Sequence, residues 1–175
     1  MNLRSTAIAG RRLNGRARLE SLQIRPATGD DIPHVRQMMQ EYVEWIGLDL
    51  AFQEIDEELS RLPGEYVPPR GALFVATEGG SYLATIALRP IDGSIAEMKR
   101  LYVRPQARGR GLARALIARL CEHAQALGYE EIRLDTLPMM GNAQALYESL
   151  GFTDIEPYYE TPIAGTRFMA RKLSR

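Results

Sequence analysis

Cysteine, histidine and lysine are all scarce in this chain, and each shortage excludes a class of site. Cys121 is the single cysteine among 175 residues, which excludes an internal disulfide framework and a cysteine-rich metal site. A free cysteine is usually a small buried hydrophobe, so an acyl-carrying thiol is not expected. The two histidines, His34 and His123, lie far apart in the sequence with no cysteine beside them, so we expect no metal site. Lys99 and Lys172 are the only lysines, and the other basic residues are arginine.

An excess of charge of either sign and a long apolar run are also missing. Basic and acidic residues number 22 each, so the formal net charge of zero gives no general attraction to nucleic acid or a membrane. No apolar run approaches the length of a membrane-spanning helix. Apolar residues make up 45% of the chain and charged residues 25%, which is typical of a globular domain. We therefore expect one compact domain with neither nucleic acid nor membrane as a partner.

The first 20 residues differ in composition from the rest. Five arginines stand there among small and polar residues, and Glu20 is the only acid. There is no continuous apolar core of a secretory signal, so we expect a cytoplasmic protein. An organelle transit peptide and a disordered or partly helical tail both fit, and the tail is favoured. The predicted organisation is an Arg-rich disordered extension over residues 1–20 and a folded domain over residues 21–175.

Hydrophobic periodicity predicts an alternation of strands and helices along residues 21–175. Strands are expected at residues 22–25, 72–77, 82–88, 95–103, 132–136, 152–155 and 167–173. Helices are expected at residues 31–43, 53–62, 112–127 and 142–150. The pairs Gly79-Gly80 and Asp92-Gly93 predict tight turns, which makes residues 72–103 an antiparallel meander. This order predicts a mixed α/β domain without internal repeats.

The most specific segment is the glycine-rich stretch from Gln106 to Ala113, which follows a predicted strand and opens a predicted helix. The first N–H groups of a helix have no intrahelical partner and carry about half a positive charge, so they favour a phosphate. Gly109 and Gly111 have no Cβ, which lets a pyrophosphate approach the backbone closely. The cationic side chains beside this turn are Arg108, Arg110 and Arg114.

Two common phosphate-binding motifs do not fit this turn. A P-loop would need lysine and then serine or threonine where Leu112 and Ala113 stand, and a dinucleotide fingerprint would need a third small residue where Arg114 stands. The remaining pattern, Gln-x-x-Gly-x-Gly-Leu-Ala, resembles the acyl-coenzyme A loop of the GNAT N-acetyltransferases. The flanking segments at residues 97–105 and 142–152 resemble the family's signatures as well, and the resemblance extends over residues 22–173.

This resemblance implies an α/β (α+β) GNAT fold, with a mixed central sheet of about seven strands flanked by about four helices. It also implies acetyl-CoA (coenzyme A) as the cofactor. In the family, two strands splay apart and their free backbone groups bind the pantetheine arm. Asn142 is either a helix N-cap, a cofactor contact or both. The implied cofactor-binding residues are Leu101, Tyr102, Val103, Arg108, Gly109, Arg110, Gly111, Leu112, Ala113, Arg114, Thr136 and Asn142.

Two residues are implied as the catalytic pair. An alkyl ammonium has a pKa near 10, so about one amine in a thousand is neutral at pH 7 and a general base is needed. Glu97 stands where the family has a glutamate base that acts directly or through water, although it could instead be a strand carboxylate paired with Lys99 or an arginine. Tyr147 stands where the family has an acid near the thioester sulfur, although it could simply pack a helix. The N–H of Leu101 or Val103 would polarise the thioester oxygen.

The acceptor is expected on the side of the two early helices and the last loop. Residues 41–65 hold eight acids against Arg61, and an acidic wall would favour a cationic small-molecule amine such as a polyamine or amino sugar. An ordinary solvated helix face is the alternative. Aromatic walls could come from Tyr42, Trp45, Tyr158 and Tyr159.

Three further hypotheses stay open beside a small-molecule amine acetyltransferase. One is a protein N-terminal or lysine acetyltransferase. Another is a non-catalytic domain that binds or senses acyl-CoA, against which the presence of both Glu97 and Tyr147 argues. The last concerns assembly, since a homodimer through the terminal strands is common in similar proteins.

Overall fold

A computed structural model describes residues 21–47 and 54–173, so the extension predicted over residues 1–20 lies outside the described residues. The strands are β1 (Gln23–Pro26), β2 (Ala72–Glu78), β3 (Ser81–Asp92), β4 (Ile95–Val103), β5 (Glu131–Thr136), β6 (Thr153–Asp154) and β7 (Arg167–Lys172). The helices are α1 (Ile32–Ile46), α2 (Ile55–Arg61), α3 (Leu112–Ala126) and α4 (Gly141–Ser149). The strands form one mixed sheet in the order β1-β2-β3-β4-β5-β7-β6, which confirms the expected fold.

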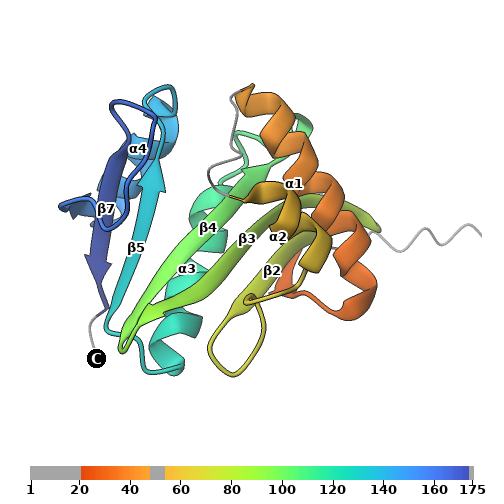
Figure 1. Ribbon diagram of the computed structural model, residues 1–175. Coiled ribbons are helices and arrows are strands. Elements are labelled where there is room, and N and C mark those ends of the chain that lie inside the picture. Colours follow the sequence, from red (N-terminus) through yellow and green to blue (C-terminus); the bar gives the residue numbers. More distant parts are fainter. Residues whose placement is uncertain (1–20, 48–53, 174–175) are drawn as a thin grey trace, which may run out of the picture.

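Helices cover both faces of the sheet and bury a separate apolar cluster on each (Figure 1). On one face, Met38 and Met39 of α1 and Leu59 of α2 pack against the meander. On the other face, Leu116 and Leu120 of α3 are fully buried. The apolar residues of α1 and of α3 recur every three or four positions, which places them on a single stripe of each helix that faces the sheet. Within the described ranges, no helix is both long enough and apolar enough to cross a bilayer.

Strand β3 is longer than its predicted range, because it continues through Pro90 to Asp92. Proline lacks a backbone N–H and therefore weakens a strand prediction. Here β2 begins at Ala72, opposite Leu88, so at Pro90 the strand β3 pairs only with β4. The missing donor therefore costs no bond to β2. The meander of β2, β3 and β4 is otherwise antiparallel, as predicted.

Strands β4 and β5 pair only at their beginnings. Their parallel register covers Ile95–Glu97 against Glu131–Arg133 and stops there. Three residues beyond the last pair, Arg100 adopts a left-handed backbone conformation with φ of 57°, and β4 shifts register against β3. The two strands diverge from this point, as Figure 1 shows. The edge of β4 at residues 98–103 and the edge of β5 at residues 134–136 therefore face each other without pairing.

Candidate active site

A cleft of about 480 Å³ opens where β4 and β5 diverge. The helices α1, α3 and α4 supply its remaining walls, and it ends at the glycine-rich turn before α3. All the predicted site residues line it except Glu97 and Arg110. Those that do are Leu101, Tyr102, Val103, Arg108, Gly109, Gly111, Leu112, Ala113, Arg114, Thr136, Asn142 and Tyr147.

The glycine-rich turn has the backbone geometry that an anion needs. Gly109 and Gly111 both have φ of 75°, a left-handed conformation that side chains other than glycine rarely adopt. A Cβ added at either position would meet no atom within 4 Å, so the space beside the backbone is open. Gly111 is the N-cap of α3, and no side chain caps this end of the helix. The first N–H groups of α3 are therefore available to a phosphate.

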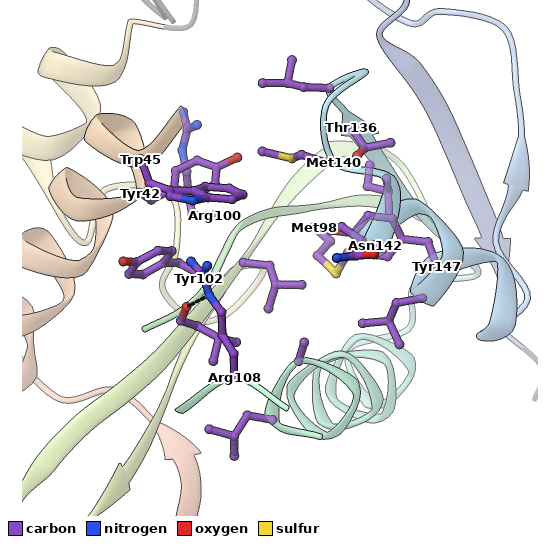
Figure 2. A pocket seen from close by; sticks show the side chains of 18 of the residues that line it. Tyr42, Trp45, Met98, Arg100, Tyr102, Arg108, Thr136, Met140, Asn142 and Tyr147 are labelled. Atoms are coloured by element: carbon purple, nitrogen blue, oxygen red, sulfur yellow. Dashed lines mark hydrogen bonds between the residues drawn. The ribbon is translucent and has the colours of Figure 1, made fainter. Parts of the chain in front are cut away.

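The three arginines of the turn have different roles. Arg108 lines the cleft, with its guanidinium 5.0 Å from the ring centre of Trp45 and its Nε donating to the carbonyl of Val103 at 3.0 Å (Figure 2). Arg114 also lines the cleft and donates to the Ser149 hydroxyl. Arg110 lies outside the lining and forms an ion pair with Glu78 at 2.8 Å.

Two hydroxyl-bearing side chains face the cleft from its deeper part. Thr136 is 2% exposed, and its Oγ1 is buried without a hydrogen-bond partner in the described part of the chain. Tyr147 of α4 is 7% exposed and contacts the edge of Phe152. Burial raises the pKa of Tyr147, and the nearby Tyr42 and Asp135 raise it further. Tyr147 is therefore a neutral phenol that can donate a proton or a hydrogen bond.

Glu97 lies beside the cleft rather than in its lining. Its side chain is 1% exposed, and Arg89 donates to its Oε2 at 2.7 Å. Tyr158 donates to its Oε1 at 2.8 Å, and the Lys99 ammonium lies 3.7 Å from the same oxygen. The alternative of a strand carboxylate paired with lysine and arginine therefore describes the observed contacts of Glu97.

Asp135 is a functional candidate that the sequence alone did not single out as catalytic. Among the described residues that line the cleft it is the single carboxylate, and its side chain is 11% exposed. The Lys99 ammonium donates to its Oδ1 at 3.4 Å, and Lys99 lines the cleft as well. The signal available in the sequence was the position of Asp135 near the end of a strand that leaves its neighbour.

The acidic wall expected from residues 41–65 does not line the cleft in the part of the segment that the structure describes. Glu58 binds Arg100 at 2.7 Å, and Glu41 binds Arg104 at 2.8 Å. Burial alone would raise the pKa of Glu58, but hydrogen bonds and the charge of Arg100 leave it below its ordinary value. No acid of this segment that the structure describes lines the cleft; Asp49 falls outside the described residues.

The predicted aromatic walls divide into two groups. Tyr42 and Trp45 of α1 line the cleft. Tyr158 and Tyr159 do not; they pack against Phe168 with ring centres 5.2 and 5.0 Å away. Among the described residues, no group of three histidine, cysteine or carboxylate side chains could hold a metal ion.

Comparison with known proteins identifies the family. The model described as the acetyltransferase (GNAT) family matches residues 33–152. This chain belongs to the GNAT family. It is 40% identical over 147 residues to an uncharacterized N-acetyltransferase of Schizosaccharomyces pombe, covering 83% of this chain and 90% of that protein. It is also 30% identical over 142 residues to the uncharacterized N-acetyltransferase YjgM of Escherichia coli, covering 78% and 85%.

Solved structures share this GNAT fold at lower sequence identity. An acetyltransferase from Streptococcus agalactiae superposes with a TM-score of 0.74 at 23% identity, covering 87% of this chain and 98% of that one. The PaiA N-acetyltransferase from Thermoplasma acidophilum, solved in complex with coenzyme A, gives a TM-score of 0.72 at 20% identity, covering 87% and 99%. At these identities the likeness shows the fold alone.

Proposed function

We propose that this GNAT chain transfers an acetyl group from acetyl-CoA directly to a primary amine of a small molecule. The observation that carries the proposal is the cleft itself, which joins the glycine-rich turn, two unpaired strand edges and a carboxylate. The Thermoplasma relative with this fold was solved with coenzyme A, which supports the choice of cofactor.

The residues present fit this cofactor along the whole cleft. The N–H groups after Gly111, together with Arg108 and Arg114, would hold its phosphates. The unpaired edges of β4 and β5 would hold the pantetheine arm through backbone hydrogen bonds, and the orphaned Thr136 hydroxyl offers a further one. When bound, acetyl-CoA supplies an activated thioester. The N–H of Leu101 or Val103 would polarise its carbonyl oxygen.

The general base must be a carboxylate that the amine can reach. Glu97 was the predicted base, but Arg89 and Tyr158 occupy its oxygens and it lies off the lining. Asp135 lines the cleft, where Lys99 donates to it at 3.4 Å and the Tyr159 hydroxyl interacts with it. In this proposal Asp135 takes the proton from the acceptor ammonium, and Glu97 contributes only through water or through Lys99.

Tyr147 is the proposed general acid. Its raised pKa keeps the phenol protonated, and its place in the lining lets it deliver that proton to the departing sulfur. A phenol with pKa above 10 is a weaker acid than a thiol with pKa near 8.5, and burial weakens this phenol further, so the transfer runs uphill and requires close contact.

Three variants test the assignment in a steady-state assay with a panel of amines, alongside acetyl-CoA binding by calorimetry. Asp135→Asn and Tyr147→Phe should each lower kcat by about 100-fold or more while acetyl-CoA affinity stays near that of the unmodified protein. Glu97→Gln should have a smaller effect. Tyr129→Phe is the matched control, because Tyr129 is a buried tyrosine outside the cleft whose hydroxyl donates to the carbonyl of Arg70.

The same assay separates this proposal from the other functions. Failure of the unmodified protein to bind acetyl-CoA would refute the cofactor assignment. Faster turnover of peptide N-termini or peptide lysines than of free amines would indicate a protein acetyltransferase. Binding without turnover of any amine or peptide would indicate an acyl-CoA sensor.

A further inference from the structure

Lys99 is a buried cation with unused hydrogen-bonding capacity. Its side chain is 7% exposed, and an ammonium has three donors. One of them is used, in a long bond of 3.4 Å to Asp135. The nearby oxygen of Glu97 lies 3.7 Å away and already accepts from Tyr158. Both ion pairs of Lys99 are long and leave donors of its ammonium unused, so it can bind a further anionic acceptor in the cleft that it lines.

Asp135 complements Lys99 at the same place. Its carboxylate accepts a bond from Lys99 and also interacts with the Tyr159 hydroxyl, but two carboxylate oxygens offer about four acceptor sites. Among the described ion pairs, Lys99–Asp135 is the one with both members in the cleft lining. The site therefore presents one cation and one anion, each able to bind a further group of opposite charge.

We infer that the acceptor is a zwitterion, an α-amino acid whose ammonium binds Asp135 and whose carboxylate binds Lys99. This inference rests on the proposed function, and it names the class of amine. An α-amino acid carries both charges a short distance apart, so it would add two charge-assisted hydrogen bonds to the long ion pair. A polyamine fits poorly, because Asp135 is the single acid in the lining, against Lys99 and three arginines.

Apolar side chains on the walls of the same cleft indicate a large apolar side chain on the amino acid. Trp45 is 52% exposed and Met139 is 56% exposed, and both line the cleft with Tyr42 and Met140. Figure 2 shows Tyr42 and Trp45 on one side and Met140 on the other. Exposed apolar side chains that face each other across a cleft gain burial when an apolar group enters between them.

The test compares two acceptors that differ only in the carboxylate, L-phenylalanine and 2-phenylethylamine, with spermidine as the polyamine. Values of kcat/KM are expressed per concentration of neutral amine, because the amines differ in pKa. We expect the unmodified protein to prefer phenylalanine by about tenfold or more, since the site would be built to bind a carboxylate. Lys99→Gln should bring the ratio of kcat/KM for phenylalanine to kcat/KM for 2-phenylethylamine close to one, mainly by raising KM for phenylalanine.

Lys172→Gln is the matched control. Lys172 is the only other lysine, its side chain is 84% exposed, and it pairs with Glu131 outside the cleft. The ratio in this variant should equal that of the unmodified protein. If Lys99→Gln does not fold by circular dichroism, Lys99→Arg replaces it, because arginine keeps the charge and should keep the preference.

The outcomes distinguish this inference from the proposed function. Acetylation of 2-phenylethylamine or spermidine as fast as phenylalanine would overturn the inference and leave the proposed function standing. A preference for phenylalanine that survives Lys99→Gln unchanged would overturn the assignment to Lys99. Absence of turnover with every amine, despite acetyl-CoA binding, would overturn both.

Discussion

Gly111 offers a way to separate backbone strain from ligand approach at the phosphate turn. It has φ of 75°, and a Cβ there would meet no atom within 4 Å. Gly111→Ala therefore adds no steric clash within the protein, and its cost is the strain of a left-handed alanine, about 1–2 kcal/mol. For a chain of this size, that loss corresponds to a fall in Tm of about 2–8 °C.

Cofactor binding should suffer more than stability in this variant. The added methyl group stands where the backbone must approach a pyrophosphate, so we expect acetyl-CoA affinity to fall about tenfold or more. Gly128→Ala is the matched control, because Gly128 has φ of 88°, equally open space around its Cβ position, and a place at the far end of α3. It should lower Tm by a similar amount without changing acetyl-CoA affinity.

Thermal unfolding gives the Tm of the two variants, and calorimetry gives their affinity for acetyl-CoA. Unchanged acetyl-CoA affinity in Gly111→Ala would refute the role of the turn, as would equal losses of affinity in both variants. Gly111→Asn sharpens the comparison, because asparagine tolerates the left-handed conformation and still fills the space. It should recover part of the Tm and none of the affinity.

Three stability predictions follow from buried residues away from the turn. Leu116→Ala should lower the free energy of unfolding in urea by about 2–5 kcal/mol, because Leu116 is fully buried. Glu58→Gln should cost about 3–5 kcal/mol, because it removes the carboxylate from the buried Arg100. Asp31 accepts two hydrogen bonds from Arg25, which hold its pKa well below its ordinary 3.8. Stability should therefore fall with pH below about 4, and Asp31→Asn should flatten that fall in acid titrations; an unchanged slope would contradict the assignment.

The order of elements and the phosphate turn could be predicted from the sequence because their signals are local. Helix α3 repeats Leu116 and Leu120 on one stripe, and its start is marked by glycines at 109 and 111 that the structure places in left-handed conformations. The divergence of β4 and β5 came only from the family resemblance, since neither periodicity nor turn residues record where a parallel pairing stops.

The charged residues were harder to predict because their partners are distant in the sequence. Glu58 and Arg100 are 42 residues apart, and Glu97 and Tyr158 are 61 apart. A count of acids over residues 41–65 therefore suggested an acidic wall for a cationic acceptor, whereas arginines of β4 and the segment after it pair with two of those acids, Glu58 and Glu41. Composition gives the number of charges in a segment, but only the fold shows which of them remain available to a substrate.

Arg100 links the cleft to the helical layer that covers it. Its left-handed backbone lies three residues after Glu97, the last residue of β4 that pairs with β5. A non-glycine residue in this conformation costs about 1–3 kcal/mol and persists only when its surroundings hold it. Glu58 of α2 supplies that hold through two hydrogen bonds to the guanidinium, at 2.9 and 2.7 Å. The ion pair between Glu58 and Arg100 thus offsets the backbone strain at the point where the cleft opens. Because Glu58 belongs to α2, which does not line the cleft, the shape of the site depends on α2 as well as on the strands.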